Sequence, residues 1–188
     1  TVLEVWGLSG SSPAQDRHRG FMEVLNSRIK VKEIFGKWKP ETVEKEIAEM
    51  DSLEEVDVVF AHNDVMAMAA RRAIERMHPG LADRICFVGI DAVSGRGSGL
   101  EAVMHGELAA SVLYPTGGSL AIRVAMQILN GEDVSRQYLL SSALIDKNNA
   151  GTLFIQSEQV VDYQHQIELQ RENLESMLCL LYTSDAAD

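Results

Sequence analysis

The sequence is poor in several features that would each point to a particular class of protein. Two cysteines in 188 residues are too few for a disulfide framework or a cysteine-based zinc site. The 17 basic residues against 28 acidic ones give a net charge of −11, which argues against a nucleic-acid-binding surface. No run approaches the roughly 20 apolar residues of a transmembrane helix. With 4 prolines and 46% hydrophobic residues, the composition is that of an ordinary globular domain.

The sequence also lacks the short motifs that indicate catalysis or a bound cofactor. It has no Gly-x-Ser-x-Gly elbow and no P-loop, and the glycines at 95, 97 and 99 have the wrong spacing for a dinucleotide-binding loop. The five histidines show no metal-ligand spacing. We therefore predict no catalytic residue, no metal site and no cofactor in this chain.

Both ends of the sequence look truncated. Thr1 is not an initiator methionine, and apolar residues at 2–8 predict a strand at the very start. The last ten residues, 179–188, resemble a translated sequencing adapter, and we exclude them from the prediction of the fold. The sequence can therefore neither imply nor deny a signal peptide.

Apolar runs and amphipathic stretches alternate regularly along the first 145 residues. The predicted strands are 2–8, 31–35, 56–61, 85–90 and 109–113, and the predicted helices are 13–27, 40–50, 64–77, 99–105 and 115–129. Strands that alternate with helices of this length indicate a parallel sheet covered on both faces. We therefore predict a doubly wound parallel α/β lobe over residues 1–145, with its first strand in or near the centre of the sheet.

The pattern changes after residue 131. Residues 138–145 predict one more strand, and residues 146–178 predict a linker and a long helix from Thr152 to Leu178. Apolar residues recur every seven positions on this helix, as in a coiled-coil seam: Leu153, Val160, Ile167 and Leu174. The companion positions are mostly polar: Gln156, Tyr163, Gln170 and Met177. We predict that this weak seam pairs two subunits in a homodimer; a helix that packs back on the lobe is the alternative.

Ligands of open parallel sheets lie beyond the carboxyl ends of the strands. In this sequence a cation, an amide, a carboxylate and two aromatic side chains follow those ends: Arg17, Asn63, Asp91, Trp38 and Tyr114. The three polar side chains offer donors and acceptors to vicinal hydroxyls, and aromatic rings pack on apolar C–H surface. We therefore predict a neutral polyhydroxylated ligand. We assign the cap of the helix at 64–77 to Asp64, which leaves Asn63 for the ligand.

Four segments resemble the type I periplasmic sugar-binding proteins of the ribose-binding kind: 14–21, 59–69, 87–92 and 113–118. The resemblance covers about residues 2–145 and corresponds to the C-terminal lobe of that two-lobed fold. It implies that Arg17, Asn63 and Asp91 occupy the sugar-binding positions of the family. Trp38 resembles the aromatic residue that stacks on the sugar ring, while Tyr114 stands where that family often has glutamine.

The segment 113–118, the exit at 146–150 and the long helix most resemble the periplasmic sensor domains of membrane-bound hybrid two-component histidine kinases. This resemblance implies a periplasmic domain whose parent protein sits in the inner membrane and reports a sugar to a histidine kinase. Two alternatives stay open: a soluble sugar-binding component of an ABC importer, and the effector domain of a lactose-repressor-like transcription regulator. The long helix favours the sensor, because the other two classes do not need it.

Overall fold

The computed structural model describes residues 1–184, apart from the side chains of 161–162, 173 and 176–184. Its strands are β1 (Val2–Trp6), β2 (Val31–Phe35), β3 (Val58–Ala61), β4 (Cys86–Asp91), β5 (Ala110–Leu113) and β6 (Leu144–Asp146). Its α-helices are α1 (Ser12–Val24), α2 (Pro40–Ala48), α3 (Asp64–Met77), α4 (Gly99–Met104), α5 (Gly118–Leu129) and α6 (Ala150–Ser184). The sheet order is β2-β1-β3-β4-β5-β6, and all neighbours are parallel except β5 and β6. The predicted parallel α/β fold is confirmed.

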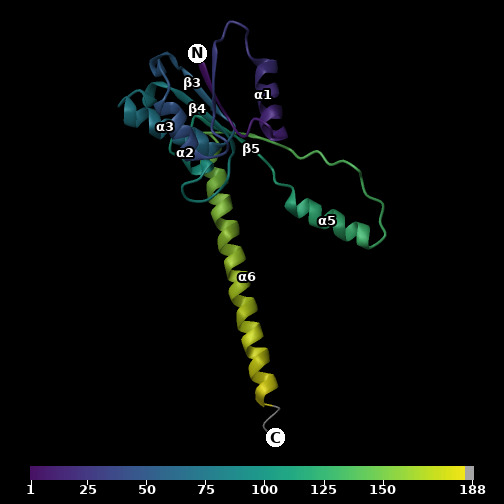
Figure 1. The fold of residues 1–188 in the computed structure, drawn as a ribbon. Helices are drawn as coiled ribbons and strands as arrows, with labels where there is room; N and C mark the ends of the chain where they lie inside the picture. The colour runs from purple at the N-terminus through teal and green to yellow at the C-terminus, as the bar shows by residue number, and fades with distance from the viewer. Residues whose placement is uncertain (185–188) are drawn as a thin grey trace.

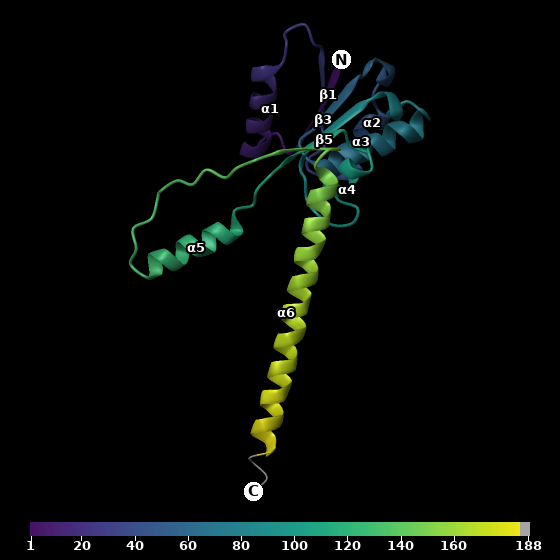
Figure 2. The same ribbon diagram turned by 180° about the vertical axis from the view of Figure 1, so that it is seen from behind.

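Helices cover both faces of the sheet, as Figures 1 and 2 show. The face under α2 and α3 carries the main core, to which Leu3, Val59 and Phe87 belong. The opposite face carries α1, where Phe21 packs on Phe60 at 4.9 Å between ring centroids. Side chains alternate between the two faces of a strand, so each strand supplies the core with every second residue.

Strand β1 pairs with both β2 and β3 and lies next to the central pair β3 and β4, in agreement with the predicted position in or near the centre. One detail of the sheet differs from the prediction. The last strand covers only Leu144–Asp146 and is antiparallel, whereas residues 138–145 were expected as a strand. Residues 130–143 instead return the chain from α5, and Leu139 is 95% exposed on the way. The apolar residues at 138–140 therefore belong to a connection and not to the sheet.

Helices α5 and α6 both leave the lobe (Figures 1 and 2). None of the residues of α5 is buried, although the helix is rich in apolar side chains. Helix α6 starts with the buried Ala150, and Leu153 packs against the core. Farther along, Val160 and Ile167 are more than half exposed. The seam is thus free of the lobe beyond its first turn, while Met177 and residues 179–188 lie outside the described side chains.

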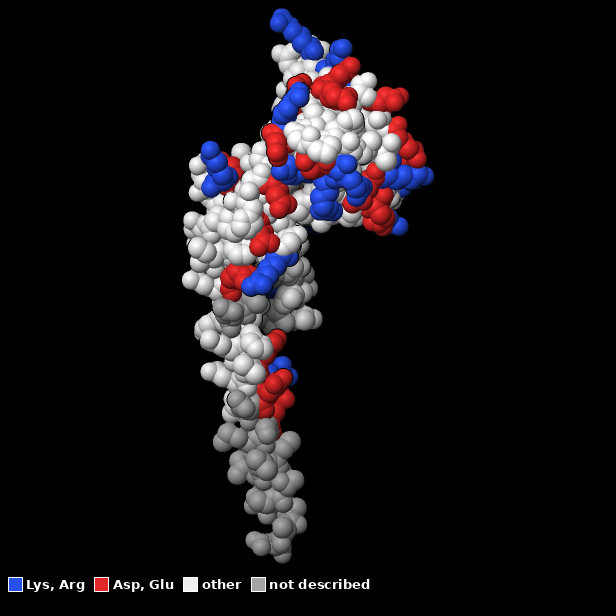
Figure 3. Space-filling view, turned by 90° about the vertical axis from the view of Figure 1, so that its left-hand side faces the viewer, with Lys and Arg blue, Asp and Glu red and all other residues white. Residues whose placement is uncertain are grey.

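The surface of the lobe carries charges of both signs. Basic and acidic side chains intermingle on the face shown in Figure 3. Among the described residues, none of the helices combines the length and apolarity needed to cross a membrane.

Candidate ligand-binding site

Arg17 lies in the second turn of α1, and its guanidinium meets groups from four other segments. Its Nη1 donates a hydrogen bond to the backbone carbonyl of His62, which follows β3. Its Nη2 lies 3.6 Å from Oδ1 of Asp91 at the end of β4. The guanidinium carbon lies 5.3 Å from the ring centroid of Trp38 and 5.2 Å from that of Tyr114. The Arg17 guanidinium thus contacts residues at the carboxyl ends of four strands: β2, β3, β4 and β5.

The two aromatic rings lie within cation–π distance of Arg17, a contact worth ~0.5–2 kcal/mol. Trp38 follows β2 and has a positive φ of 65°. Its indole lies on Gly7, where a Cβ would overlap the ring, so glycine is needed for this close approach. Tyr114 is 54% exposed, and much of its ring therefore faces solvent.

Asp91 ends β4 in a backbone conformation that L-residues rarely adopt. Its φ is 122°, and that of Ala92 is 48°. Such angles cost conformational energy and persist only where the surroundings hold them. Burial raises the pKa of the Asp91 carboxyl above its ordinary value, and the charge of Arg17 opposes part of that rise. Arg17 therefore favours the ionised form of Asp91.

The N-cap of α3 corrects the prediction made from the sequence. Asn63 is the cap, since its Oδ1 accepts a hydrogen bond from the Met66 backbone N–H at 3.0 Å. The assignment of the cap to Asp64 was wrong, because that side chain turns into the core and is only 2% exposed. The oxygen of Asn63 is committed to the helix, so a ligand at Asn63 would meet its amide nitrogen.

Asp64 is a buried carboxylate next to the gathered residues. The Ser111 hydroxyl donates to its Oδ1 at 2.6 Å, and the Ala92 N–H donates to its Oδ2 at 2.7 Å. Burial raises the pKa of Asp64 from 3.8 to about 6, and the charge of Asp91 adds to the rise. The two hydrogen bonds and the charge of Arg17 lower this pKa in part. The sequence analysis missed this residue as a part of the site.

A second buried network lies beneath the turn that carries Asn63. Glu4 and His62 are both fully buried, and His62 Nε2 lies 2.9 Å from Glu4 Oε1. The Gly7 N–H donates to Nδ1 of His62 at 3.2 Å, so Nε2 carries the proton and donates to Glu4. His18 Nδ1 lies 2.9 Å from the other oxygen of Glu4. A glutamate inside the apolar run at 2–6 was the signal in the sequence that could have revealed this network.

One group of side chains has the donor types of a metal site. The ligand atoms of Glu4, His18 and Glu33 all lie within 4.8 Å of one another. Hydrogen bonds already account for their positions, because two histidines contact Glu4 and the Trp6 indole N–H donates to Glu33 at 2.9 Å. The three residues thus form a hydrogen-bond network that runs from the buried Glu4 to the exposed Glu33.

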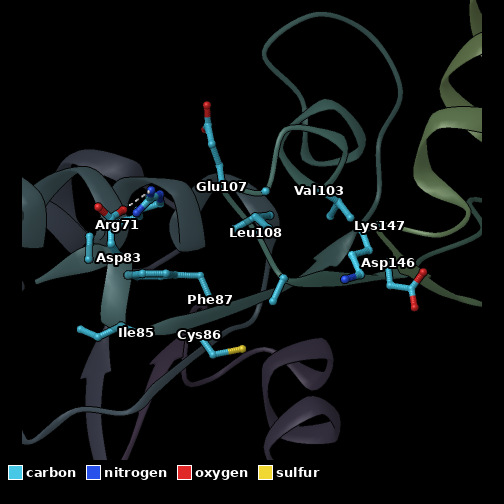
Figure 4. A pocket seen from close by; sticks show the side chains of 13 residues that line it. Arg71, Asp83, Ile85, Cys86, Phe87, Val103, Glu107, Leu108, Asp146 and Lys147 are labelled. Carbon is cyan, nitrogen blue, oxygen red and sulfur yellow. Dashed lines mark hydrogen bonds and ion pairs between the residues drawn. The ribbon is translucent and has the colours of Figure 1, made fainter. Parts of the chain in front are cut away.

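Two hollows of similar size lie at different edges of the sheet. One of about 460 Å³ adjoins Arg17 and Tyr114 and has Ile90, Val112 and Leu113 among its lining residues. The other, of about 450 Å³, lies where β4 and β5 begin and is drawn in Figure 4. Its side chains include the ion pair of Arg71 and Asp83 at 3.1 Å, together with Phe87, Glu107 and Lys147. None of the five predicted site residues lines this second hollow.

The structure brings four of the five predicted residues into one group. Arg17, Trp38, Asp91 and Tyr114 meet directly through the guanidinium. Asn63 is linked to this group indirectly. The residue before it, His62, accepts a hydrogen bond from Arg17 through its backbone carbonyl. Their role in binding a ligand stays a prediction.

Comparison with known proteins identifies the family of the chain. Residues 1–133 match the family model described as a periplasmic binding protein domain. The ribose import binding protein RbsB of Salmonella typhimurium is 32% identical over 153 residues, which cover 78% of this chain and 49% of the relative. The chain thus spans about half the length of the curated relatives it matches.

Solved structures resemble the chain as well. The fructose-binding periplasmic domain of the hybrid two-component system BT1754 has a TM-score of 0.80 and 32% identity, over 89% of this chain and 57% of that one. A Mycobacterium smegmatis protein in complex with β-D-fucofuranose has a TM-score of 0.72 and 26% identity, over 86% of this chain and 54% of that one. Because the family model covers well over half of the sequence, the chain belongs to the periplasmic binding protein domain family.

Proposed function

We propose that this chain is the sugar-binding lobe of a periplasmic receptor, with a monosaccharide as its ligand. The observation that carries the proposal is the position of Arg17, which lies between its aromatic neighbours and Asp91 at the carboxyl edge of the sheet. The similar proteins named above support it, since their names refer to ribose, fructose and fucofuranose.

The chemistry of the group suits hydroxyls that are next to each other on a ring. The guanidinium of Arg17 donates in a fixed fork, and the carboxylate of Asp91 accepts, so the two can serve one pair of vicinal hydroxyls. The Trp38 and Tyr114 rings offer apolar faces to the C–H side of the sugar. In this proposal Asn63 donates its amide N–H to a further hydroxyl.

We further propose that the receptor is the sensor of a hybrid two-component system, with the domain in the periplasm and its parent protein anchored in the inner membrane. Support comes from the likeness to the BT1754 domain and from α6, which carries an exposed apolar seam away from the lobe. Pairing of two such seams would bury Val160, Ile167 and Leu174 in a homodimer and pass the signal to a histidine kinase. Polar residues at Gln156 and Gln170 would weaken the seam enough to allow two packings.

The second candidate is a soluble sugar-binding component of an ABC importer. The observation in its favour is the match to a ribose import binding protein at the same 32% identity as the sensor domain. A membrane span and kinase motifs in the parent gene would support the sensor, whereas a stop codon soon after residue 178 would support the importer component.

The test of sugar binding is a nuclear magnetic resonance titration of the ¹⁵N-labelled chain with D-fructose and D-ribose. We expect this chain to bind a sugar weakly, because it supplies only half of a two-lobed cleft. Chemical shifts are suitable because they detect weak binding. We expect shifts at the amides of Arg17, Asn63 and Asp91 and at the Trp38 indole N–H. Shifts confined to the hollow near Arg71, or no shifts with either sugar, would contradict the proposal.

A further inference from the structure

Asp91 stands beside Arg17 only because the backbone at residues 91–92 keeps two consecutive positive φ angles, 122° and 48°. Neither residue is glycine, so the chain would relax from this conformation unless other groups held it. The question is therefore which group holds the turn.

The hydrogen bonds of Ala92 identify that group. Its N–H donates to Oδ2 of Asp64 at 2.7 Å and, at a longer 3.1 Å, to Oγ of Ser111. The Ser111 hydroxyl in turn donates to Oδ1 of Asp64 at 2.6 Å. Both contacts of Ala92 thus lead to one carboxylate, which ties the end of β4 to the start of α3 and to β5.

Two glycines leave the space that the Asp64 carboxylate occupies. A Cβ on Gly89 would overlap Oδ1 of Asp64, and a Cβ on Gly99 would overlap Oδ2. Gly89 lies in β4 and Gly99 begins α4, so two elements leave space at the same point. Neither glycine has a positive φ, so the need for space rather than for backbone freedom accounts for them.

We propose that Asp64 is the positioning residue of the site: its carboxylate holds Ala92 and thereby fixes Asp91 beside Arg17. This inference concerns the site of the proposed function and rests on that function for the identity of the ligand. Asp64 is itself almost fully buried, so it acts through Asp91 and does not touch the ligand. The charged groups that face it are Asp91 and Arg17; burial raises the pKa of Asp64, and its two hydrogen bonds lower that pKa in part.

The first test does not require a ligand and uses hydrogen exchange of the Ala92 amide. In Asp64→Ala this amide should exchange at least about 10-fold faster than in the wild type, because its shorter hydrogen bond is lost. Asp64→Asn, which keeps an acceptor oxygen, should stay within about 3-fold of the wild type. Ile74→Ala, a core truncation farther along the same helix, is the matched control and should not single out Ala92 for faster exchange. The inference would be overturned if the Ala92 amide exchanged at the same rate in Asp64→Ala as in the wild type. It would also be overturned if Asp64→Asn lost as much protection at Ala92 as Asp64→Ala does.

The second test is sugar affinity, measured by the D-fructose and D-ribose titrations. Asp64→Ala should weaken binding about 10-fold, Asp64→Asn should restore most of it, and Ile74→Ala should leave it unchanged. Unchanged affinity in Asp64→Ala would overturn the positioning role. If the wild type binds neither sugar, the proposed function fails, and the exchange of Ala92 still decides the role of Asp64.

Discussion

Asp64 and Arg17 have opposite charges and opposite roles at the same edge of the sheet. Arg17 is held by His62, Asp91 and two aromatic rings. Asp64 lies beneath it with both oxygens accepting hydrogen bonds from the protein. We propose that Arg17, which is only partly buried, contacts the ligand, and that the buried Asp64 fixes the geometry of the site.

The raised pKa of Asp64 predicts an unusual dependence of stability on pH. Above pH 6 the carboxylate is charged in both states, and its burial costs the folded state about 3 kcal/mol relative to the neutral acid. Between pH 6 and 4 the folded protein binds the proton before the unfolded chain does, so this group adds stability as the pH falls. Asp64→Asn is neutral throughout, and it should be more stable than the wild type at pH 7.5 by up to about 3 kcal/mol.

Urea unfolding of the wild type and Asp64→Asn at pH 7.5 and pH 4.5 measures this difference. We expect the gap between the two proteins to narrow at pH 4.5, where Asp64 is largely protonated. A gap that is the same at both pH values, or a variant less stable at pH 7.5, would contradict the assignment of the raised pKa.

The residues that surround Arg17 could be predicted because each follows a strand, and strand ends of a parallel sheet meet at one edge. The roles of Asn63 and Asp64 could not be predicted from the sequence. Both suit a helix cap, and only the observed start of α3 at Asp64 decides between them. The apolar run at 2–6 marks its glutamate, Glu4, as unusual, but no local pattern indicates that His62, 58 residues away, is its partner.

At the scale of elements, the five β-α repeats could be predicted because their apolar runs are short and bounded by turn residues. The structure of segment 138–145 could not be predicted, because an apolar run in an exposed connection has the same composition as a strand. Its return to the sheet is marked instead by the Ser142 hydroxyl, which donates to the Leu113 carbonyl at 2.7 Å.

The seam of α6 makes a prediction about neighbouring subunits. In the proposed membrane-anchored parent protein, with Cys86 changed to serine, single cysteines at Val160 or Ile167 should form disulfide dimers readily. Cysteines at Glu158 or Glu168, off the seam, are the matched controls and should cross-link less. Equal yields at all four positions would leave no support for a parallel, in-register pair.

At the scale of the whole molecule, we expect the lobe to be stable without α5. The helix contributes no buried residue, and Ile122 and Leu129 are 69% and 79% exposed. Changing either to glutamate should therefore shift the free energy of unfolding of this chain by less than about 0.5 kcal/mol. Urea unfolding checks this, and a loss of 2 kcal/mol or more would show that α5 packs on the lobe. Ile47→Ala, a core truncation, should lose about 2–5 kcal/mol in the same assay.

The central claim is that a sugar binds at the carboxyl edge of the sheet through Arg17, and the chain offers a matched control for it. Arg71 also lies over an aromatic ring, Phe87 at 5.8 Å, and pairs with an aspartate, Asp83 at 3.1 Å, but at the hollow of Figure 4. The deciding measurement is the titration of Arg17→Ala and Arg71→Ala with D-fructose and D-ribose, followed at the Trp38 indole N–H. We predict that Arg17→Ala weakens binding by about 10-fold or more, because a charged hydrogen bond to the ligand is lost, while Arg71→Ala binds like the wild type. Equal affinities in the two variants, or a loss in Arg71→Ala alone, would contradict the account.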